Sequence, residues 1–167
     1  TCNILFSAHK TGVKKLLYLG SSCIYPRESA QPVKEDYLLT GLPEPTNEGY
    51  AIAKIAGVRI CDYYMGQYGD SFISCIPANV YGPNDNFNEK NNHVIPALLQ
   101  RFHNAKKNKL PYVEIWGSGK AEREFLYIDD AAEACLFVMQ KYDGPGTINI
   151  GMGKTTSISE LAKRIKQ

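Results

Sequence analysis

The chain has 167 residues, the size of one ordinary domain, and 44% of them are hydrophobic, which is enough for a sizeable core. Nineteen basic and seventeen acidic residues give a formal charge of +2, a balance that argues against a nucleic-acid partner. The five cysteines are widely spaced without a Cys-x-x-Cys pattern, so we expect neither a disulfide framework nor a metal site. Signal peptide, Asn-x-Ser/Thr sequon and membrane-spanning run are all absent, which predicts a cytoplasmic protein without a membrane partner.

The first residues, 1–12, have the pattern of a helix that is already under way. A dinucleotide-binding domain normally begins with a strand, a glycine-rich turn and an acidic residue about twenty positions later, and the sequence contains no such pattern. We therefore expect that the glycine-rich N-terminal part is absent and that these residues come from the middle of a longer protein.

The next predicted elements are a strand, a loop and a long helix. An apolar run between Gly12 and Gly20 predicts a buried strand over 14–20. Residues 26–45 are polar and contain several prolines, which predicts a loop long enough to cover a substrate. The helix that follows begins near Asn47 and runs to about Gly69. It is apolar on more than one face, so one face is expected on the sheet and the other against a partner subunit or another part of the chain.

The remaining elements continue the alternation of strands and helices. They are strands over 71–76, 112–116 and 147–150, a turn over 77–83, helices over 92–108 and 129–141, and a last helix that Ser157 and Glu160 open with a capping box. This order predicts an α/β fold, a partial Rossmann-like doubly wound parallel sheet with part of a small substrate-binding subdomain. We assign 1–83 to the dinucleotide-binding domain and 84–167 to substrate-binding elements plus a returning strand and helix.

Tyr50 and Lys54 are the first chemical signal. Four residues make slightly more than one helical turn, so the phenol and the ammonium share a face, and the cation favours the phenolate over the phenol. Ser21 lies just after the predicted strand over 14–20, at the sheet edge where ligands bind in open α/β folds. Together these three side chains predict a site that reduces a carbonyl by hydride transfer. The alternative is a half-buried tyrosine beside a surface lysine.

Three motifs in this order resemble the extended short-chain dehydrogenase/reductases that act on nucleotide sugars. They are Leu19-Gly20-Ser21-Ser22-Cys23-Ile24-Tyr25-Pro26, Glu44-Pro45-Thr46-Asn47-Glu48-Gly49-Tyr50-Ala51-Ile52-Ala53-Lys54, and Pro77-Ala78-Asn79-Val80-Tyr81-Gly82-Pro83. Within that superfamily the chain is similar to the GDP-L-fucose synthases over nearly its whole length. The resemblance implies epimerisation at C3 and C5 of GDP-4-keto-6-deoxy-D-mannose, reduction at C4 with NADPH, and a homodimer.

The resemblance also implies which residues contact NADP. They are Leu19, Gly20, Ser21, Ser22, Tyr50, Lys54, Pro77, Ala78, Asn79, Val80 and His93. The residue that would distinguish NADP from NAD belongs to the glycine-rich part of the fold, so NADP rests on the resemblance alone.

Cys23 and His93 are the candidates for epimerisation, which requires a base and an acid beside the carbons that exchange protons. A thiolate and an imidazole can both move protons near neutral pH. Taken from the residues alone, a cysteine beside a strand is more often part of the core. The resemblance assigns both side chains to catalysis, because Ser-Ser-Cys and Asn-His-Val-Ile-Pro are motifs of the GDP-L-fucose synthases.

Arg101 and Arg123 are the candidates for the diphosphate of a GDP-sugar, because guanidinium groups bind phosphate in a bidentate manner. The resemblance carries both over as substrate contacts. Trp116, the only tryptophan, either stacks on the sugar or base or belongs to the core. His9 and His103 have no partner pattern and are expected at the surface.

Two other functions remain open. A nucleotide-sugar 4-epimerase or 4,6-dehydratase of the same superfamily would share Tyr50 and Lys54 but carry threonine and a carboxylate where Ser22 and Cys23 stand. A non-catalytic binding module would keep the sheet without the cofactor half.

Overall fold

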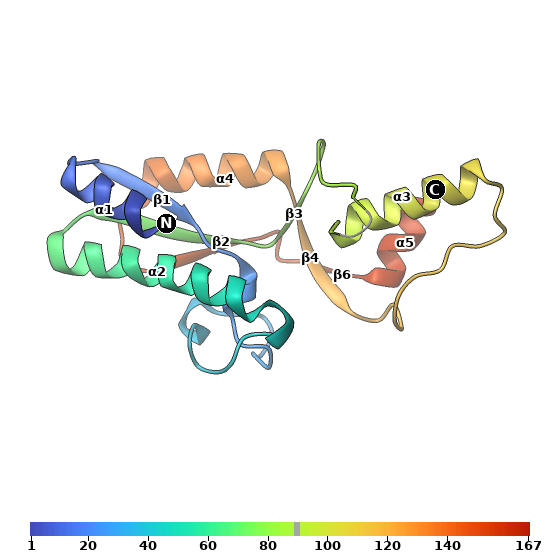
Figure 1. Ribbon diagram of the computed structural model, residues 1–167, viewed down its shortest axis with the longest axis horizontal. Helices are drawn as coiled ribbons and strands as arrows, with labels where there is room; N and C mark the ends of the chain where they lie inside the picture. Colours follow the sequence, from blue (N-terminus) through green and yellow to red (C-terminus); the bar gives the residue numbers. More distant parts are fainter. Residues whose placement is uncertain (89–90) are drawn as a thin grey trace. The chain divides into compact units, whose positions relative to one another are not determined.

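A computed structural model describes residues 1–88 and 91–167 (Figure 1). Contacts divide the chain into two compact units, one of Thr1–Ala78 with Asp130–Gly151 and one of Asn79–Asp129 with Met152–Gln167. The first cut falls after Ala78, whereas we expected one after residue 83, and the returning helix and strand belong to the first unit. Within the described residues no helix has the length and hydrophobicity needed to cross a membrane.

The first unit is built on a parallel sheet of three strands, as the sequence predicted. Its strands are β1 (Lys15–Leu19), β2 (Ser71–Pro77) and β5 (Thr147–Ile150), in the order β1-β2-β5. Leu19 pairs with Cys75 and Pro77 pairs with Ile150, so the carboxyl ends of all three strands lie at one edge. Ligands bind at this edge in open α/β sheets.

Helices cover both faces of this sheet, which gives the doubly wound arrangement. Figure 1 shows α2 (Glu48–Tyr68) and α4 (Ile128–Lys141) on opposite sides of the strands, and α1 (Cys2–Lys10) packs beside α2. Two apolar clusters fill the α2 side. One contains Ile24, Tyr25, Leu38, Val58 and Ile76, and the other contains Leu5, Ala8, Cys61 and Phe72.

We expected His9 to be a surface residue without a partner, but it is partly buried and contacts Asp70. Its Nδ1 lies 2.7 Å from a carboxylate oxygen of Asp70, and its ring centroid lies 4.4 Å from that of Tyr68. The partner stands 61 positions away in the sequence, so no local pattern indicates it. His103 is exposed, as expected.

The second unit contains a sheet of β3 (Asn79–Tyr81), β4 (Glu122–Tyr127) and β6 (Thr155–Ser157), with β3 parallel and β6 antiparallel to β4. Two helices, α3 (Val94–Lys107) and α5 (Ile158–Lys166), pack against each other. The Ser157 hydroxyl accepts a hydrogen bond from the backbone N–H of Glu160 at 3.2 Å, which confirms its predicted capping role.

Two sequence predictions in this unit were wrong, and two strands were not predicted. Residues 112–116 form no strand; Val113 and Ile115 are partly buried, whereas Tyr112 and Trp116 are 77% and 78% exposed. Part of the predicted turn over 77–83 is strand β3. The sequence also gave no signal for β4, which begins with the charged residues Glu122-Arg123-Glu124, or for the three-residue β6.

Two glycines allow α2 and β2 to approach β1. A Cβ on Gly20 would stand 2.2 Å from Cδ1 of Ile76, and a Cβ on Gly57 would stand 2.3 Å from the Tyr18 ring. Gly20 also donates its N–H to the carbonyl of Cys75 at 2.8 Å. The seam between β1 and α2 therefore requires the absence of a side chain at Gly57.

We predict that Gly57→Ala destabilises the protein by about 1–3 kcal/mol, the usual cost of overpacking. The added methyl group would overlap the Tyr18 ring and push α2 away from β1. Gly66→Ala is the matched control, because this position lies in the same helix with nothing within 4 Å of the added Cβ. There the higher helix propensity of alanine should stabilise by about 0.5–1 kcal/mol. Urea unfolding of both variants measures the difference, and equal free energies of unfolding would contradict the tight seam.

Candidate active site

A short turn follows strand β1 and carries the serines and the cysteine predicted from the sequence. Ser22–Ile24 form a single 3-10 turn, and Ser21 precedes it as the N-cap. The Ser21 Oγ accepts a hydrogen bond from the backbone N–H of Cys23 at 3.5 Å. Ser21 and Cys23 are both partly exposed, so their side chains remain accessible from the sheet edge.

Helix α2 presents Tyr50 and Lys54 to the end of β1. The Lys54 ammonium donates a hydrogen bond to the carbonyl oxygen of Leu19 at 2.8 Å. It also lies 5.7 Å from the centroid of the Tyr50 ring and 5.3 Å from that of the Tyr18 ring. Tyr50 is 48% exposed. The two side chains thus share a helix face, as their spacing predicted, and the ammonium lies close to both the Tyr50 ring and the strand end.

Pro77 and Ala78 complete the edge of the sheet in the first unit. Both are partly exposed, and the Ala78 N–H donates to the Ile150 carbonyl at 2.8 Å. The parallel register brings this strand end beside that of β1. The predicted residues that this unit collects at one sheet edge are Leu19, Gly20, Ser21, Ser22, Cys23, Pro77 and Ala78, with Tyr50 and Lys54 contributed from α2.

The second unit carries the other predicted contacts. Asn79 and Val80 lie on β3, where the Asn79 amide donates to the Glu124 carbonyl at 2.9 Å. His93 is the N-cap of α3 and opens the helix, as predicted. Its carbonyl accepts the Ala97 N–H at 2.9 Å, and the residue is exposed.

Arg101 and Trp116, two of the three residues predicted to contact the substrate, contact each other. The Arg101 guanidinium lies 4.2 Å from the centroid of the Trp116 ring, a cation–π geometry. Because Trp116 is 78% exposed, the alternative of a core tryptophan is wrong. Arg123 is exposed on β4, and its side chain donates to the carbonyl of Glu122 at 2.7 Å.

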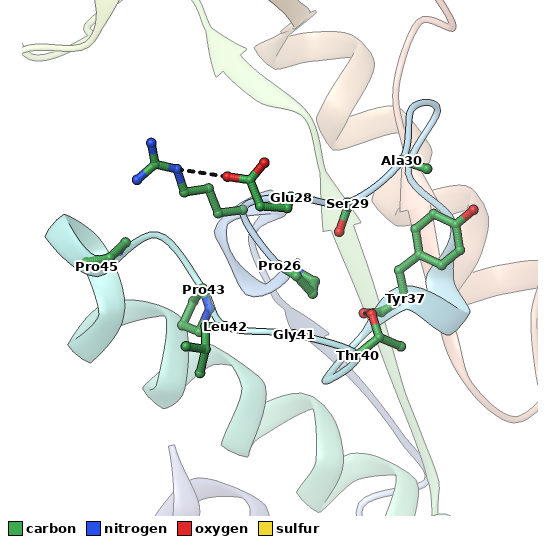
Figure 2. Close-up of a pocket in the computed structure, with 11 residues that line it drawn as sticks. Pro26, Glu28, Ser29, Ala30, Tyr37, Thr40, Gly41, Leu42, Pro43 and Pro45 are labelled. Carbon is green, nitrogen blue, oxygen red and sulfur yellow. Dashed lines mark hydrogen bonds and ion pairs between the residues drawn. The ribbon is translucent and has the colours of Figure 1, made fainter.

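The segment over residues 26–45 folds around a pocket of its own in the first unit (Figure 2). The cavity measures about 710 Å³ and is lined mostly by apolar side chains. Arg27 is one of the lining residues, and its Nε lies 3.3 Å from a carboxylate oxygen of Glu28. None of the predicted catalytic residues lines this pocket. A substrate-covering role for the segment stays a prediction.

Comparison with known proteins identifies the family. The family described as NAD dependent epimerase/dehydratase matches residues 1–151. The chain belongs to this family. Tyr50, Lys54 and the turn around Cys23 all lie inside the matched region.

The similar members of the family include several GDP-L-fucose synthases. The chain is 53% identical to GDP-L-fucose synthase 1 of Arabidopsis thaliana over 165 residues, which cover 99% of this chain and 51% of that protein. It is 51% identical to the Escherichia coli enzyme over 98% of this chain and 54% of the other. A GDP-L-fucose synthetase from Naegleria fowleri bound to NADP superposes with a TM-score of 0.87 at 35% identity, over 98% of this chain and 53% of that one. The chain therefore spans about half the length of the curated relatives it matches.

Sequence reasoning missed two members of the site region, Tyr25 and Asn149. Tyr25 ends the turn that carries Cys23, is 7% exposed, and donates its hydroxyl to the amide oxygen of Asn149 at 2.5 Å. The available signal was Asn149 between two isoleucines in the partly buried strand Thr147–Ile150, since buried polar groups are normally hydrogen-bonded. The pattern did not identify the partner, which lies 124 positions away.

Burial raises the pKa of Tyr25 to about 12 despite its hydrogen bond to Asn149. In the unfolded chain a tyrosine has a pKa of about 10. The buried phenol therefore contributes its full stabilisation of the folded state below pH 10, and this contribution is lost as the pH rises toward 12. Between pH 9 and 11.5 we predict that the wild type loses about 2 kcal/mol more stability than Tyr25→Phe. Urea unfolding across this range tests the prediction. The buried thiols Cys61 and Cys75, whose pKa values burial also raises to about 12, contribute equally to both proteins. Parallel pH profiles would contradict a buried, neutral phenol.

Proposed function

We propose that the chain carries the catalytic residues of a GDP-L-fucose synthase, which epimerises GDP-4-keto-6-deoxy-D-mannose at C3 and C5 and reduces it at C4 with NADPH. The observation that carries the proposal is the contact between Lys54 and the Leu19 carbonyl, at 2.8 Å. It sets the phenol of Tyr50 beside the strand end that continues into Ser21 and Cys23. An identity near 50% to GDP-L-fucose synthases over almost the whole chain supports the same function.

Reduction at C4 is assigned to Tyr50, Ser21 and Lys54. Tyr50 donates a proton to the carbonyl oxygen, and the Ser21 hydroxyl orients that oxygen by a hydrogen bond. The Lys54 ammonium stabilises the phenolate that proton donation leaves behind. Lys54 is held in place for this role by the Leu19 carbonyl.

Epimerisation is assigned to Cys23 and His93. The ketone at C4 makes the protons on C3 and C5 acidic, so a base removes one and an acid returns it on the other face. Cys23 is partly exposed beside Ser21, and His93 is exposed at the start of α3. Both side chains are therefore free to exchange protons with a substrate.

The described residues fit the nicotinamide cofactor, which would supply the hydride. Leu19 is 46% exposed at a strand end, beside hydroxyl groups at the edge where dinucleotides bind. The proposed NADP contacts in the first unit are Leu19, Gly20, Ser21, Ser22, Tyr50, Lys54, Pro77 and Ala78, and those in the second are Asn79, Val80 and His93. The proposed contacts with the GDP-sugar are Arg101, Trp116 and Arg123.

The assembly proposed is a cytoplasmic homodimer that pairs through the outer face of α2. Ile52 and Tyr63 on this helix are 55% and 68% exposed, whereas Ala51, Val58 and Cys61 on the inner face are buried. An exposed apolar stripe on a long helix is the kind of surface that a second copy covers.

A 4-epimerase or 4,6-dehydratase of the same family is the second candidate, because it would use Tyr50 and Lys54 in the same way. Cys23 distinguishes the two functions. It stands at the sheet edge where those enzymes are expected to carry a carboxylate, and it is accessible rather than part of the core. A non-catalytic binding module would show neither reduction nor proton exchange.

We predict that substitution of the reduction residue Tyr50 and substitution of the epimerisation residues Cys23 and His93 impair different reactions. The protein, expressed from its complete reading frame, is incubated with the keto sugar in deuterated water, first without NADPH and then with it. Tyr50→Phe should lower reduction by about 10²-fold or more, the scale of a lost general acid, and still incorporate deuterium at C3 and C5. Cys23→Ser and His93→Gln should suppress that incorporation. Nuclear magnetic resonance of the sugar and NADPH absorbance measure the two steps.

Tyr68→Phe is the control for loss of a hydroxyl, because this exposed tyrosine ends the same helix, away from the Lys54 contact. Normal reduction by Tyr50→Phe would remove the assignment of Tyr50. Unchanged deuterium incorporation in both Cys23→Ser and His93→Gln would leave a simple reductase. A wild-type protein without either activity would favour the binding module.

A further inference from the structure

The turn that carries Cys23 is too short to be stable by itself. It consists of the three residues Ser22–Ile24, and fixing so few residues with one or two backbone hydrogen bonds is entropically unfavourable. Its start is capped by the Ser21 hydroxyl through a long, 3.5 Å hydrogen bond. The other end must therefore supply much of the constraint on the position of the thiol.

Tyr25 supplies that constraint at the C-terminal end of the turn. The ring is 7% exposed and packs in the cluster with Ile24 and Val58. Its hydroxyl donates a hydrogen bond to the Asn149 amide oxygen at 2.5 Å. Because burial holds the pKa of this phenol at about 12, the hydroxyl keeps its proton and remains a donor at neutral pH.

Asn149 is fixed in turn by contacts on its other atoms. Its side-chain nitrogen donates to the Val33 carbonyl at 3.2 Å, and its backbone N–H donates to a carboxylate oxygen of Glu35 at 2.9 Å. The residue belongs to β5 and pairs with Ile76 of β2, so its backbone is part of the parallel sheet. Because the amide nitrogen donates to the Val33 carbonyl, the amide oxygen points toward Tyr25 and accepts its hydrogen bond.

We propose that Tyr25 and Asn149 are positioning residues that hold the Cys23 turn against the sheet for proton transfer at C3 and C5. The proposal rests on the proposed function, since it names what keeps the epimerisation base in place. It distinguishes two residues at one sheet edge. Tyr50 is positioned from α2 through the contact between Lys54 and Leu19, whereas Cys23 is positioned from β5 through the contact between Asn149 and Tyr25.

The first test compares the rate of proton exchange with the rate of reduction in Tyr25→Phe and in Asn149→Ala. A small displacement of a catalytic group can lower the reaction rate by up to about 10²-fold. We therefore expect the rate of deuterium incorporation at C3 and C5 to fall about 10-fold or more in each variant. NADPH consumption should fall less. The fraction of reduced sugar that keeps the substrate's configuration at C3 and C5 should therefore rise. Loss of folded protein alone would lower both reactions together and leave this fraction unchanged.

The double variant Tyr25→Phe/Asn149→Ala tests whether the two residues act through one contact. If they do, it should lose no more exchange activity than the worse single variant. Tyr37→Phe is the matched control, because it removes a hydroxyl from the neighbouring 3-10 turn Glu35–Tyr37 outside the contact with Asn149. It should keep the wild-type product ratio. A wild-type product ratio in Tyr25→Phe, or fully additive losses in the double variant, would overturn the proposal.

A second readout does not depend on the substrate. Alkylation of Cys23 by iodoacetamide, followed by peptide mass spectrometry, should be faster by several-fold in Tyr25→Phe than in the wild type because the released turn exposes the thiol. Cys2 is an exposed thiol far from the turn in the sequence and serves as the internal reference, with an unchanged rate. Equal Cys23 rates would overturn the positioning role even if the enzyme is active. A wild-type protein that neither exchanges nor reduces the sugar, with Cys23 released in Tyr25→Phe, would overturn the proposed function and keep the structural contact.

Discussion

The hydrogen bond from the Lys54 ammonium to the Leu19 carbonyl is the interaction on which the site depends, because it joins the two elements that carry its chemistry. Strand β1 ends at Leu19 and delivers Ser21 and Cys23 within the next few residues. Helix α2 carries Tyr50 one turn before Lys54. A cation held at this junction links the strand and the helix and lies 5.7 Å from the centroid of the Tyr50 ring.

Close packing makes that link geometrically available. Gly57 lets α2 lie directly on the Tyr18 ring, and Gly20 lets Ile76 lie against the strand end. The same Tyr18 ring stands 5.3 Å from the Lys54 nitrogen. The core on the α2 side and the candidate site are thus adjoining parts of one seam, so a substitution that separates α2 from β1 should weaken both stability and catalysis.

The elements and residues with local patterns could be predicted from the sequence, and those that depend on distant partners could not. The spacing of Tyr50 and Lys54, the apolar runs of β1 and β2, and the Ser157 cap are all local signals, and the structure confirms them. The His9 contact with Asp70 and the Tyr25 contact with Asn149 join residues 61 and 124 positions apart. Residues 112–116 contain strand-forming residues but form no strand, because such residues make a strand only where a neighbouring strand pairs with them. The functional roles of all the site residues remain predictions, namely those of Ser21, Cys23, Tyr50, Lys54, His93, Arg101, Trp116 and Arg123.

A structure of the complete protein with NADP and the keto sugar tests the central claim most directly. We predict that the Tyr50 hydroxyl and the Ser21 Oγ both lie within hydrogen-bonding distance of the C4 oxygen, about 2.6–3.2 Å. Lys54 should still contact the Leu19 carbonyl, and the Cys23 sulfur should face C3 or C5 of the same sugar. A sugar whose C4 oxygen contacts neither hydroxyl, with Lys54 still bound to Leu19, would contradict the assignment of this sheet edge as the active site.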